Sequence, residues 1–229
     1  MKDKILITGG TGFIGSHLAE TFFKKNFKVT VFDRYNPNYN LGNLEYSKYK
    51  NKINYIFGDI RDYDSVNKAI EKNDIIIHLA ALIGIPYSYI SPLAYIKTNV
   101  EGTYNVLESV KKNKNKKLII TSTSEVYGSA DYTPIDEKHP LKPQSPYSAS
   151  KIAADNLALS YFNSFNTPVV ILRPFNTFGP RQSERAIIPT IIKQILRTNN
   201  NEISLGNLYP KREFNYVDDV CDAYLKILK

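Results

Sequence analysis

KILITGGTGFIG, residues 4–15, is a short apolar run that ends in glycines and leads into a segment with helical patterning, residues 13–25. The apolar run predicts a buried parallel strand, and the glycines predict the turn into a helix. Gly9 would allow a tight turn, Gly12 would let the backbone approach a pyrophosphate, and Gly15 would allow close packing of helix on strand. The start of the helix would also offer unpaired N–H groups to phosphates. We therefore expect a dinucleotide-binding loop here; the alternative is merely a tight turn.

The rest of the chain alternates between strand and helix patterns. Strands are expected at residues 28–33, 53–57, 74–78, 117–122 and 169–173, and helices at 63–72, 92–112, 147–164 and 217–229. Regular alternation of this kind predicts an α/β fold, a Rossmann-like doubly wound parallel sheet with helices on both faces. Residues 36–51 are rich in Asn, Tyr and Lys and lack clear periodicity, so a surface excursion is expected there.

Composition narrows the class of protein. The chain has 229 residues, 42% of them hydrophobic, with 30 Lys and Arg against 22 Asp and Glu. The apolar share is typical of a globular protein, and no apolar run approaches the roughly 18–20 residues that span a bilayer. The positive charge is mostly Lys spread along the chain, and its dense run at residues 111–117 is interpreted as a solvated turn rather than a nucleic-acid site. A single cysteine, Cys221, and a start that enters a strand directly, without room for a signal peptide, favour a cytoplasmic protein.

Polar residues follow the predicted strands where a dinucleotide would lie. Asp33 ends the second strand, where a carboxylate accepts hydrogen bonds from ribose hydroxyls and repels a 2′-phosphate, which favours NAD over NADP. Arg34 could instead hold a 2′-phosphate, or could simply face solvent. Asp59 follows the third strand and could meet the adenine amino group. His78 is expected to be a structural strand-end residue, and the small residues after it would let the backbone lie against the cofactor.

A tyrosine and a lysine four residues apart open the helix predicted at 147–164. Ser145 can cap this helix, and Pro146 suits its first position. Tyr147 and Lys151 would then lie on one helix face, where the ammonium would lower the pKa of the phenol. A phenol tuned in this way can accept a proton from a sugar hydroxyl as hydride leaves for NAD.

Hydroxyl and carboxyl side chains follow the fifth predicted strand. Ligands of an open α/β sheet bind beyond the carboxyl ends of its strands. Thr123 supplies a hydroxyl that could share a substrate hydroxyl with Tyr147. Glu125 could remove a proton from carbon, which a dehydration needs and a 4-epimerisation does not. The alternative for Glu125 is an exposed turn carboxylate.

Together these motifs resemble the extended short-chain dehydrogenases/reductases, in particular the NAD-dependent epimerase/dehydratase family. The resemblance rests on the glycine loop, on Ser-Thr-Ser-Glu-Val-Tyr-Gly at 122–128, on Tyr-Ser-Ala-Ser-Lys at 147–151 and on Arg-Pro-Phe-Asn-Thr-Phe-Gly-Pro-Arg at 173–181. HLAALIGIPYSY at 78–89 and RQSERAIIPT at 181–190 are similar to 4,6-dehydratases of nucleotide-activated N-acetylglucosamine. Within that group the nearest likeness is the enzyme of legionaminic acid biosynthesis.

The resemblance implies a redox-neutral 4,6-dehydratase with NAD as cofactor, a nucleotide-sugar as substrate and no metal. Tyr147 and Thr123 would help to oxidise C4, Glu125 would remove the C5 proton as the C6 hydroxyl departs, and hydride would return to C6. Ser124 stands where some members have Asp as the acid for the departing hydroxyl, so the proton donor stays open. The substrate contacts implied are Asn176, Arg181 and Arg212. The NAD contacts expected are Gly9, Gly12, Phe13, Ile14, Gly15, Asp33, Arg34, Asp59, Ile60, Leu79, Ala80, Ala81, Ser122, Tyr147, Lys151 and Pro174.

The expected organisation is an NAD-binding Rossmann domain over residues 1–175 and the start of a substrate-binding region, interleaved with it, over 176–229. Family members usually continue well beyond this length, so we expect a largely truncated substrate lobe, with weak NAD binding and poor turnover by this chain alone. Members commonly pair through helices equivalent to 92–112 and 147–164, which implies a homodimer.

Three other functions stay open. A UDP-glucuronate decarboxylase shares the segment at 122–128 and the first oxidation, but then loses CO2. A nucleotide-sugar 4-epimerase would leave Glu125 without a task. A non-catalytic dinucleotide sensor is the more remote alternative, because such proteins often lose the tyrosine–lysine pair that is present here.

Overall fold

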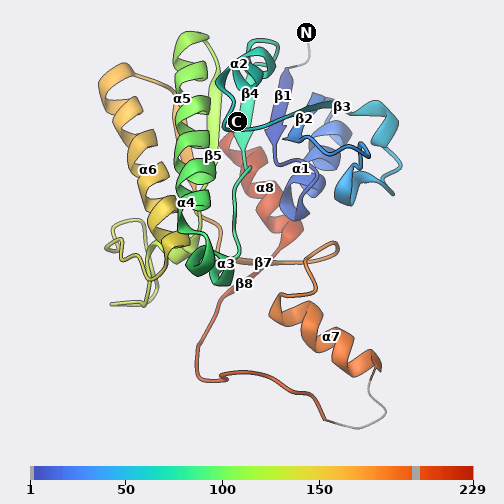
Figure 1. Ribbon diagram of the computed structural model, residues 1–229, viewed down its shortest axis with the longest axis vertical. Coiled ribbons are helices and arrows are strands. Elements are labelled where there is room, and N and C mark those ends of the chain that lie inside the picture. Colours follow the sequence, from blue (N-terminus) through green and yellow to red (C-terminus); the bar gives the residue numbers. More distant parts are fainter. Residues whose placement is uncertain (1–2, 198–201, 229) are drawn as a thin grey trace. The chain divides into compact units, whose positions relative to one another are not determined.

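The computed structural model describes residues 3–197 and 202–228. The chain divides into two compact units, Met1–Pro174 and Phe175–Lys229. Figure 1 labels most of the helices and strands of both units, with colours that follow the sequence.

The first unit contains a six-stranded sheet. Its strands are β1 (Lys4–Thr8), β2 (Lys28–Arg34), β3 (Asn54–Gly58), β4 (Ile75–His78), β5 (Lys117–Thr121) and β6 (Val169–Leu172). They lie in the order β3-β2-β1-β4-β5-β6, and all neighbours are parallel. The chain therefore leaves β1 toward one edge and returns to the other edge through β4. The predicted doubly wound parallel sheet is confirmed, with its switch point between β1 and β4.

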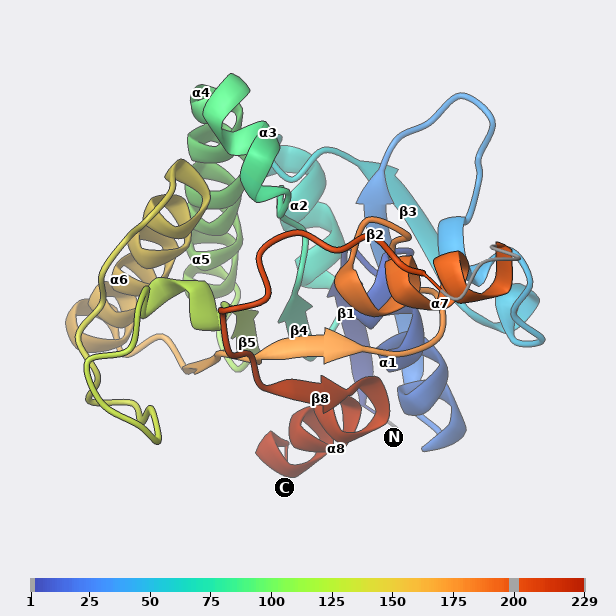
Figure 2. The ribbon, with the colours of Figure 1, turned by 90° about the horizontal axis from the view of Figure 1, so that it is seen from below.

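Helices cover both faces of this sheet. The helices of this unit are α1 (Phe13–Lys24), α2 (Tyr63–Glu71), α3 (Ile85–Ile90), α4 (Pro92–Tyr95), α5 (Gly102–Lys112) and α6 (Pro146–Phe165), of which the short α3 and α4 pack on α6. Figures 1 and 2 show α1 on one face, and α2, α5 and α6 side by side on the other.

Burial of both faces of the sheet explains why the strand sequences are continuous apolar runs. Ile5, Leu6 and Ile7 of β1 are almost completely buried although their side chains alternate between the two faces. Leu6 belongs to the cluster that also contains Val106 of α5 and Ala158 of α6. Since helices cover both faces, neither face of β1 can be polar.

One predicted helix has an unexpected interior. Residues 92–112 do form a continuous helical stretch, but the middle part, η3 (Ile96–Glu101), is π-helical. The Asn99 side chain leaves this stretch and hydrogen-bonds both the N–H and the C=O of Leu82, at 2.8 and 2.9 Å, and Ser150 Oγ, at 2.9 Å. The π turn thus ties the segment after β4 to α6, in keeping with the frequent occurrence of such turns near functional sites.

The predicted excursion at residues 36–51 contains two short 3₁₀ turns, η1 (Gly42–Leu44) and η2 (Lys50–Lys52). It returns to the glycine loop, because the N–H of Asn43 donates to the Thr11 carbonyl at 3.0 Å. The excursion therefore contacts the turn that the sequence predicts as a phosphate cradle.

The second unit is smaller. Its elements are β7 (Asn176–Phe178), α7 (Ile187–Arg197), β8 (Phe214–Tyr216) and α8 (Val217–Ile227), and β7 and β8 pair in parallel. The helix predicted at 217–229 corresponds to α8, which ends at Ile227 with Leu228 as its C-cap; Lys229 lies outside the described residues.

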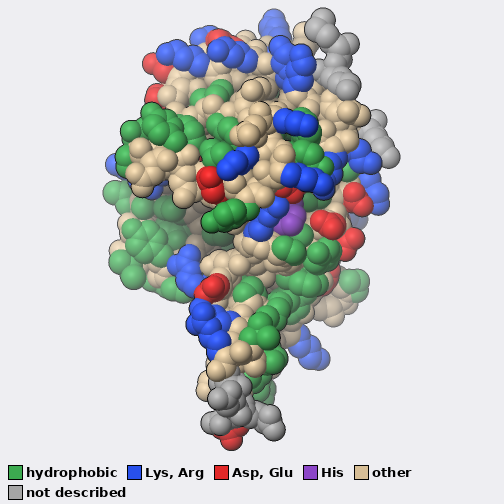
Figure 3. All heavy atoms as spheres, turned by 90° about the vertical axis from the view of Figure 1, so that its right-hand side faces the viewer, with side chains coloured by type: hydrophobic (Ala, Val, Ile, Leu, Met, Phe, Trp, Pro, Cys, Tyr) green, Lys and Arg blue, Asp and Glu red, His purple; other side chains and the backbone are tan. Residues whose placement is uncertain are grey.

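None of the helices described is both long enough and apolar enough to cross a bilayer. On the face drawn in Figure 3, Lys and Arg side chains are interspersed with acidic and apolar ones.

Candidate active site

The glycine loop between β1 and α1 has the geometry that its sequence predicts. Gly9 adopts φ +72°, a conformation that side chains rarely take, and its N–H donates to the Phe32 carbonyl at 2.8 Å. A Cβ on Gly15 would overlap the Gly9 carbonyl oxygen, whereas a Cβ on Gly12 would meet only that oxygen, at 3.2 Å. Gly15 thus serves packing, while the Gly12 side of the loop is left open.

Gly12 also begins α1 without a side-chain cap. The first N–H groups of a helix have no partner within the helix, so an anion can satisfy them. The open approach at Gly12 and the uncapped helix start fit the pyrophosphate of a dinucleotide.

Asp33 fixes this loop to the end of β2. Its Oδ2 accepts from the Thr11 N–H at 2.9 Å and from Thr11 Oγ1 at 2.5 Å, and its Oδ1 accepts from the Arg34 N–H at 2.8 Å. The carboxylate is partly buried and Arg34 is exposed. A carboxylate oxygen can accept more than one hydrogen bond, so the predicted ribose contact is compatible with these bonds and stays a prediction.

Asp59, at the end of β3, forms an ion pair that the sequence analysis did not anticipate. Its oxygens accept from Arg61 Nε at 2.9 Å and from Arg61 Nη2 at 2.5 Å, and the hydrogen bond to Arg61 lowers the Asp59 pKa. The predicted contact of this carboxylate with adenine would therefore compete with Arg61.

His78, at the end of β4, is structural, as expected. It is buried, with Nδ1 at 2.8 Å from Thr8 Oγ1 and Nε2 at 3.2 Å from Thr103 Oγ1. Burial, with a smaller effect from the Lys151 charge, lowers the His78 pKa to about 3. The ring is therefore neutral at physiological pH.

The backbone after His78 lies directly against the glycine loop. The Ala80 N–H donates to Thr8 Oγ1 at 3.2 Å, and a Cβ on Gly9 would come within 2.9 Å of the Ala80 nitrogen. The ends of β1 and β4 thus meet at the switch point, and the contact of the small residues after His78 with the cofactor stays a prediction.

Other residues predicted to contact the cofactor also follow strands or open α1 in this unit. They are Phe13, Ile14, Ile60, Leu79, Ala81, Ser122 and Pro174. Ile60 belongs to the core cluster, so its side chain serves packing.

The start of α6 carries the predicted tyrosine and lysine. Ser145 Oγ accepts from the Ser148 N–H at 3.1 Å, and Ser148 Oγ accepts from the Ser145 N–H at 3.0 Å, which makes a capping box with Pro146 at the first helical position. Tyr147 is 7% exposed and Lys151 is 5% exposed. The cap therefore fixes the turn that holds both side chains.

The expectation that Lys151 lowers the Tyr147 pKa is wrong for the protein without ligands. Burial raises the pKa of Tyr147 to about 12; a hydrogen bond with Thr123 opposes this rise, and the Glu125 charge adds to it. Lys151 Nζ donates instead to the Thr121 carbonyl at 2.7 Å. Loss of hydration of the phenolate thus outweighs any help from the ammonium.

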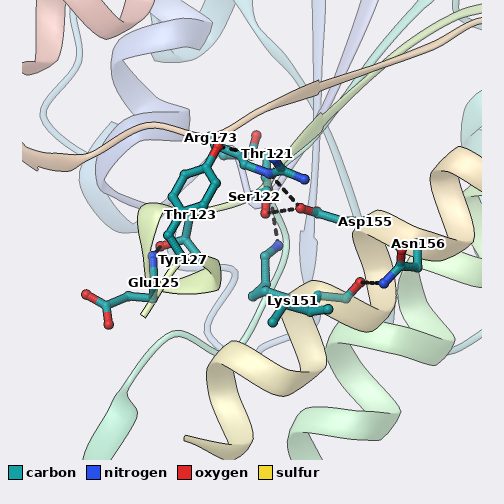
Figure 4. Close-up of polar contacts among 10 residues, drawn as sticks. Thr121, Ser122, Thr123, Glu125, Tyr127, Lys151, Asp155, Asn156 and Arg173 are labelled. Carbon is teal, nitrogen blue, oxygen red and sulfur yellow. Dashed lines mark hydrogen bonds and ion pairs between the residues drawn. The ribbon is translucent and has the colours of Figure 1, made fainter. Parts of the chain in front are cut away.

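The segment after β5 supplies the remaining predicted groups. It forms a short turn, η4 (Ser124–Val126), and Thr123 Oγ1 accepts from the Glu125 N–H at 3.2 Å. The Ser124 N–H donates to the Pro174 carbonyl at 3.2 Å. Glu125 is half-buried, and Figure 4 shows its carboxylate directed away from Lys151. The Glu125 charge contributes to the raised pKa of Tyr147, and the role of Glu125 as a base stays a prediction.

Three residues of this site were missed by the sequence analysis. Asp155 Oδ2 accepts from Ser122 Oγ and from Arg173 Nε, both at 2.9 Å, and Arg173 Nη1 donates to the Tyr127 hydroxyl at 3.2 Å (Figure 4). The spacing of Asp155, four residues after Lys151 on one helix face, was the available signal.

The predicted substrate residues lie in the second unit. Asn176 Nδ2 donates to the Glu213 carbonyl at 3.1 Å, and Arg212 Nη1 donates to the Lys211 carbonyl at 2.9 Å. Arg181 lines a cavity of about 610 Å³ between α7 and Tyr216. Their contacts with a substrate stay predictions.

Among the residues that the structure describes, no group of three His, Cys, Asp or Glu side chains could hold a metal ion.

Comparison with known proteins places these motifs in a family. Residues 6–229 match the family described as GDP-mannose 4,6 dehydratase. A dTDP-D-glucose 4,6-dehydratase of Dictyostelium discoideum is 39% identical over 242 residues, covering 99% of this chain and 55% of that protein. The chain thus spans little more than half the length of this curated relative.

Two solved structures share the fold over nearly the whole chain. DesIV, a dTDP-glucose 4,6-dehydratase from Streptomyces venezuelae with NAD and TYD bound, has a TM-score of 0.87 and 31% identity, covering 98% of this chain and 71% of that one. A UDP-N-acetylglucosamine 4-epimerase from Methanobrevibacter ruminantium M1, in complex with UDP-N-acetylmuramic acid, has a TM-score of 0.88 and 34% identity, covering 98% and 73%. The chain therefore belongs to the GDP-mannose 4,6 dehydratase family, within the epimerase/dehydratase group of the extended short-chain dehydrogenases/reductases.

Proposed function

We propose that this chain carries the NAD site and the reaction centre of a nucleotide-sugar 4,6-dehydratase. The reaction is the redox-neutral conversion of a nucleotide-activated N-acetylglucosamine-type hexose to its 4-keto-6-deoxy sugar. The carrying observation is that Thr123, which hydrogen-bonds the Tyr147 phenol, also accepts at Oγ1 from the Glu125 N–H at 3.2 Å, so that the three residues are joined at the end of β5. A hydroxyl, a phenol and a carboxylate at one place suit an oxidation followed by an elimination.

NAD, when bound, would supply the hydride acceptor for the oxidation at C4 and, once reduced, the hydride donor for C6. The glycine loop would bind its pyrophosphate, and Asp33 its adenosine ribose. The first unit, with a boundary near residue 175, would be the NAD-binding domain, and residues 176–229 would begin the substrate-binding region. Support for NAD comes from the fit of the loop and from the cofactor seen in the DesIV structure.

The side chains divide the proton transfers. Tyr147, with Thr123 hydrogen-bonded to it, would take the proton of the C4 hydroxyl. The ketone formed at C4 acidifies the C5 proton, which Glu125 would remove as the C6 hydroxyl leaves. Ser124 adjoins Glu125 and would relay the proton taken from the C4 hydroxyl to the departing C6 hydroxyl, which leaves as water. Glu125 would return a proton to C5 as hydride reaches C6, so that one water is lost in each cycle.

A nucleotide-sugar 4-epimerase is the second candidate, because the M. ruminantium structure resembles this chain as closely as DesIV does. It would use the same oxidation at C4 but leave C5 and C6 untouched. The half-buried Glu125 beside Tyr147 favours the dehydratase.

The setting and assembly are also proposals. A buried single cysteine, Cys221, agrees with a reducing compartment, and we place the reaction in the cytoplasm. Exposed apolar side chains on α6, Leu159, Phe162 and Phe165, support a homodimer that pairs through this helix.

A substrate panel tests the proposed function. The protein is incubated with excess NAD and, in turn, UDP-N-acetylglucosamine, GDP and dTDP hexoses, and UDP-glucuronate, for long enough to detect the slow turnover expected of this chain. Each product is analysed by mass spectrometry. We expect one hexose substrate to lose the mass of one water. A product of unchanged mass would instead assign an epimerase, and loss of CO2 from UDP-glucuronate a decarboxylase.

A further inference from the structure

Asp155 joins three elements behind the candidate reaction centre. It lies on α6, is 2% exposed, and accepts at Oδ2 from Ser122 Oγ, just after β5, and from Arg173 Nε, just after β6. Figure 4 shows these side chains meeting above Lys151. Burying a carboxylate is costly unless it is paired and hydrogen-bonded, and here both conditions are met.

The same carboxylate anchors the acceptor of Lys151. Lys151 Nζ donates to the Thr121 carbonyl, and the next residue, Ser122, is held by Asp155. Asp155 and Lys151 are four residues apart on α6, so both project toward the end of β5. Two neighbouring hydrogen bonds, one at Thr121 and one at Ser122, therefore join α6 to the end of β5.

The negative charge of Asp155 also acts on the Lys151 ammonium. Its Oδ1 is buried and has no hydrogen-bond partner among residues 3–197 and 202–228. Burial lowers the pKa of Lys151 to about 8, and the Asp155 charge is what opposes this fall. Removal of that charge would bring the lysine close to losing its proton at neutral pH.

The other charged or titratable groups around Lys151 do not supply the negative charge that Asp155 supplies. They are His78 at the end of β4, Tyr147 on α6, Glu125 in η4 and Arg173 after β6. His78 is neutral near pH 7 and Tyr147 is protonated there, because their pKa values are about 3 and about 12. Arg173 repels an ammonium, and the Glu125 carboxylate points away from it (Figure 4).

We propose that Asp155 is a positioning residue of the reaction centre, which holds Lys151 against the Thr121 carbonyl and keeps it in the ammonium form. The proposal rests on the proposed function only for its consequence, an ammonium available to Tyr147 during proton transfer. The charge of Lys151 itself can be measured without substrate or cofactor.

The test is an NMR titration of the lysine side chains in ¹⁵N-labelled protein, with the Lys151 signal identified by its loss in Lys151→Met. In the unaltered protein we expect Lys151 to be an ammonium at pH 7. Asp155→Asn should shift its titration downward by about 1 pH unit or more. Asp131→Asn, which removes a carboxylate from an exposed pair with Lys142, should leave it unchanged.

Several outcomes overturn the proposal. Asp155→Ser provides a second charge removal should the amide variant not fold, and an unshifted Lys151 in either folded variant contradicts the proposal. A Lys151 that is already neutral at pH 7 in the unaltered protein contradicts it without any variant.

Activity gives an independent readout. In the active protein, the alkaline limb of the kcat/KM pH profile should move to lower pH in Asp155→Asn and return in Asp155→Glu. A uniform loss of activity with no movement of that limb would reduce Asp155 to a structural role. Because the titration needs no turnover, failure of the proposed function leaves this test intact.

Discussion

The phenol of Tyr147 is 7% exposed, and its pKa of about 12 means that it is protonated when no ligand is bound. It can act as a base only once something stabilises the phenolate. A positive charge held against the ring would do so, as would a stronger hydrogen bond from Thr123 or a new one from Lys151. Lys151, as a buried ammonium at the same site, is the protein's own source of such charge.

Two glycines of the phosphate loop should respond differently to the same substitution. Gly15→Ala places a methyl on the Gly9 carbonyl and should destabilise the protein by about 1–3 kcal/mol, whereas Gly12→Ala has more room and should cost less. Gly12→Ala should instead weaken dinucleotide binding, because its methyl would stand where the pyrophosphate approaches.

Urea unfolding and NAD titration of both variants measure these effects. Gly84→Ala is the matched control, since its Cβ would meet nothing closer than 3.7 Å. Equal loss of stability in the Gly12 and Gly15 variants would contradict the division of roles between them.

At the scale of elements, the first turns of α6 hold Tyr147 and Lys151 at the end of β5. Its capping box uses two serines, Ser145 and Ser148, rather than the usual serine and glutamate. Tyr147 lies between them, so the cap restricts the phenol as well as the helix end.

Ser145→Ala should lower the free energy of unfolding by about 1 kcal/mol, because it removes one of the two capping hydrogen bonds. Ser160→Ala, at an exposed position within the same helix, should change it by less than about 0.5 kcal/mol. Denaturant unfolding curves of the two variants provide the comparison. Equal free energies of unfolding in the two variants would contradict a stabilising role of the cap.

The sequence predicts helices and strands well where the hydrophobic period of a segment agrees with the residues that end it, such as glycines. The strand of residues 4–8 and its glycines needed only local rules, and Tyr147 and Lys151 needed only helical spacing. The π-helical turn at Asn99 could not be predicted, because it depends on the backbone of Leu82, a tertiary partner. The excursion at 36–51 lacks periodicity for a related reason, since its contact with Thr11 is nonlocal.

The sequence predicted which residues form the candidate site, but it did not predict how that site shifts the pKa of Tyr147. Thr123, Glu125, Tyr147 and Lys151 follow from motif and spacing. The raised pKa of Tyr147 does not follow, because it depends on burial and on where the Lys151 ammonium points. Asp155 was missed because its partners, Ser122 and Arg173, come from two other strand ends.

At the scale of the whole molecule, the buried His78 links stability to pH. Its pKa falls from an ordinary value of 6.5 to about 3 on folding. Between these values the unfolded chain binds the extra proton, so His78 contributes stability that is complete above pH 6.5 and is lost as the pH falls toward 3.

We expect the free energy of unfolding to fall by up to about 1.4 kcal/mol per pH unit from this group as the pH drops below its ordinary pKa. In His78→Asn the free energy of unfolding should fall less steeply with decreasing pH, because this contribution is absent, even if the variant is less stable at pH 7. Urea unfolding at several pH values between neutral and about 4.5 separates this effect from that of the carboxylates, which titrate lower. Identical slopes in both proteins would contradict the assignment of His78 as a buried neutral ring.

We propose that Tyr147, with Thr123, takes the proton of the C4 hydroxyl as NAD accepts the C4 hydride, and that Glu125 then removes the C5 proton. The measurement is turnover in deuterated water by Glu125→Gln, with Glu137→Gln, an exposed carboxylate in the loop after η4, as the control. Glu137→Gln should give a product that has lost one water and carries deuterium at C5. Glu125→Gln should form that product at least about 100-fold more slowly, the usual effect of losing a positioned base. Equal rates of deuterium-labelled product from the two variants would contradict the claim.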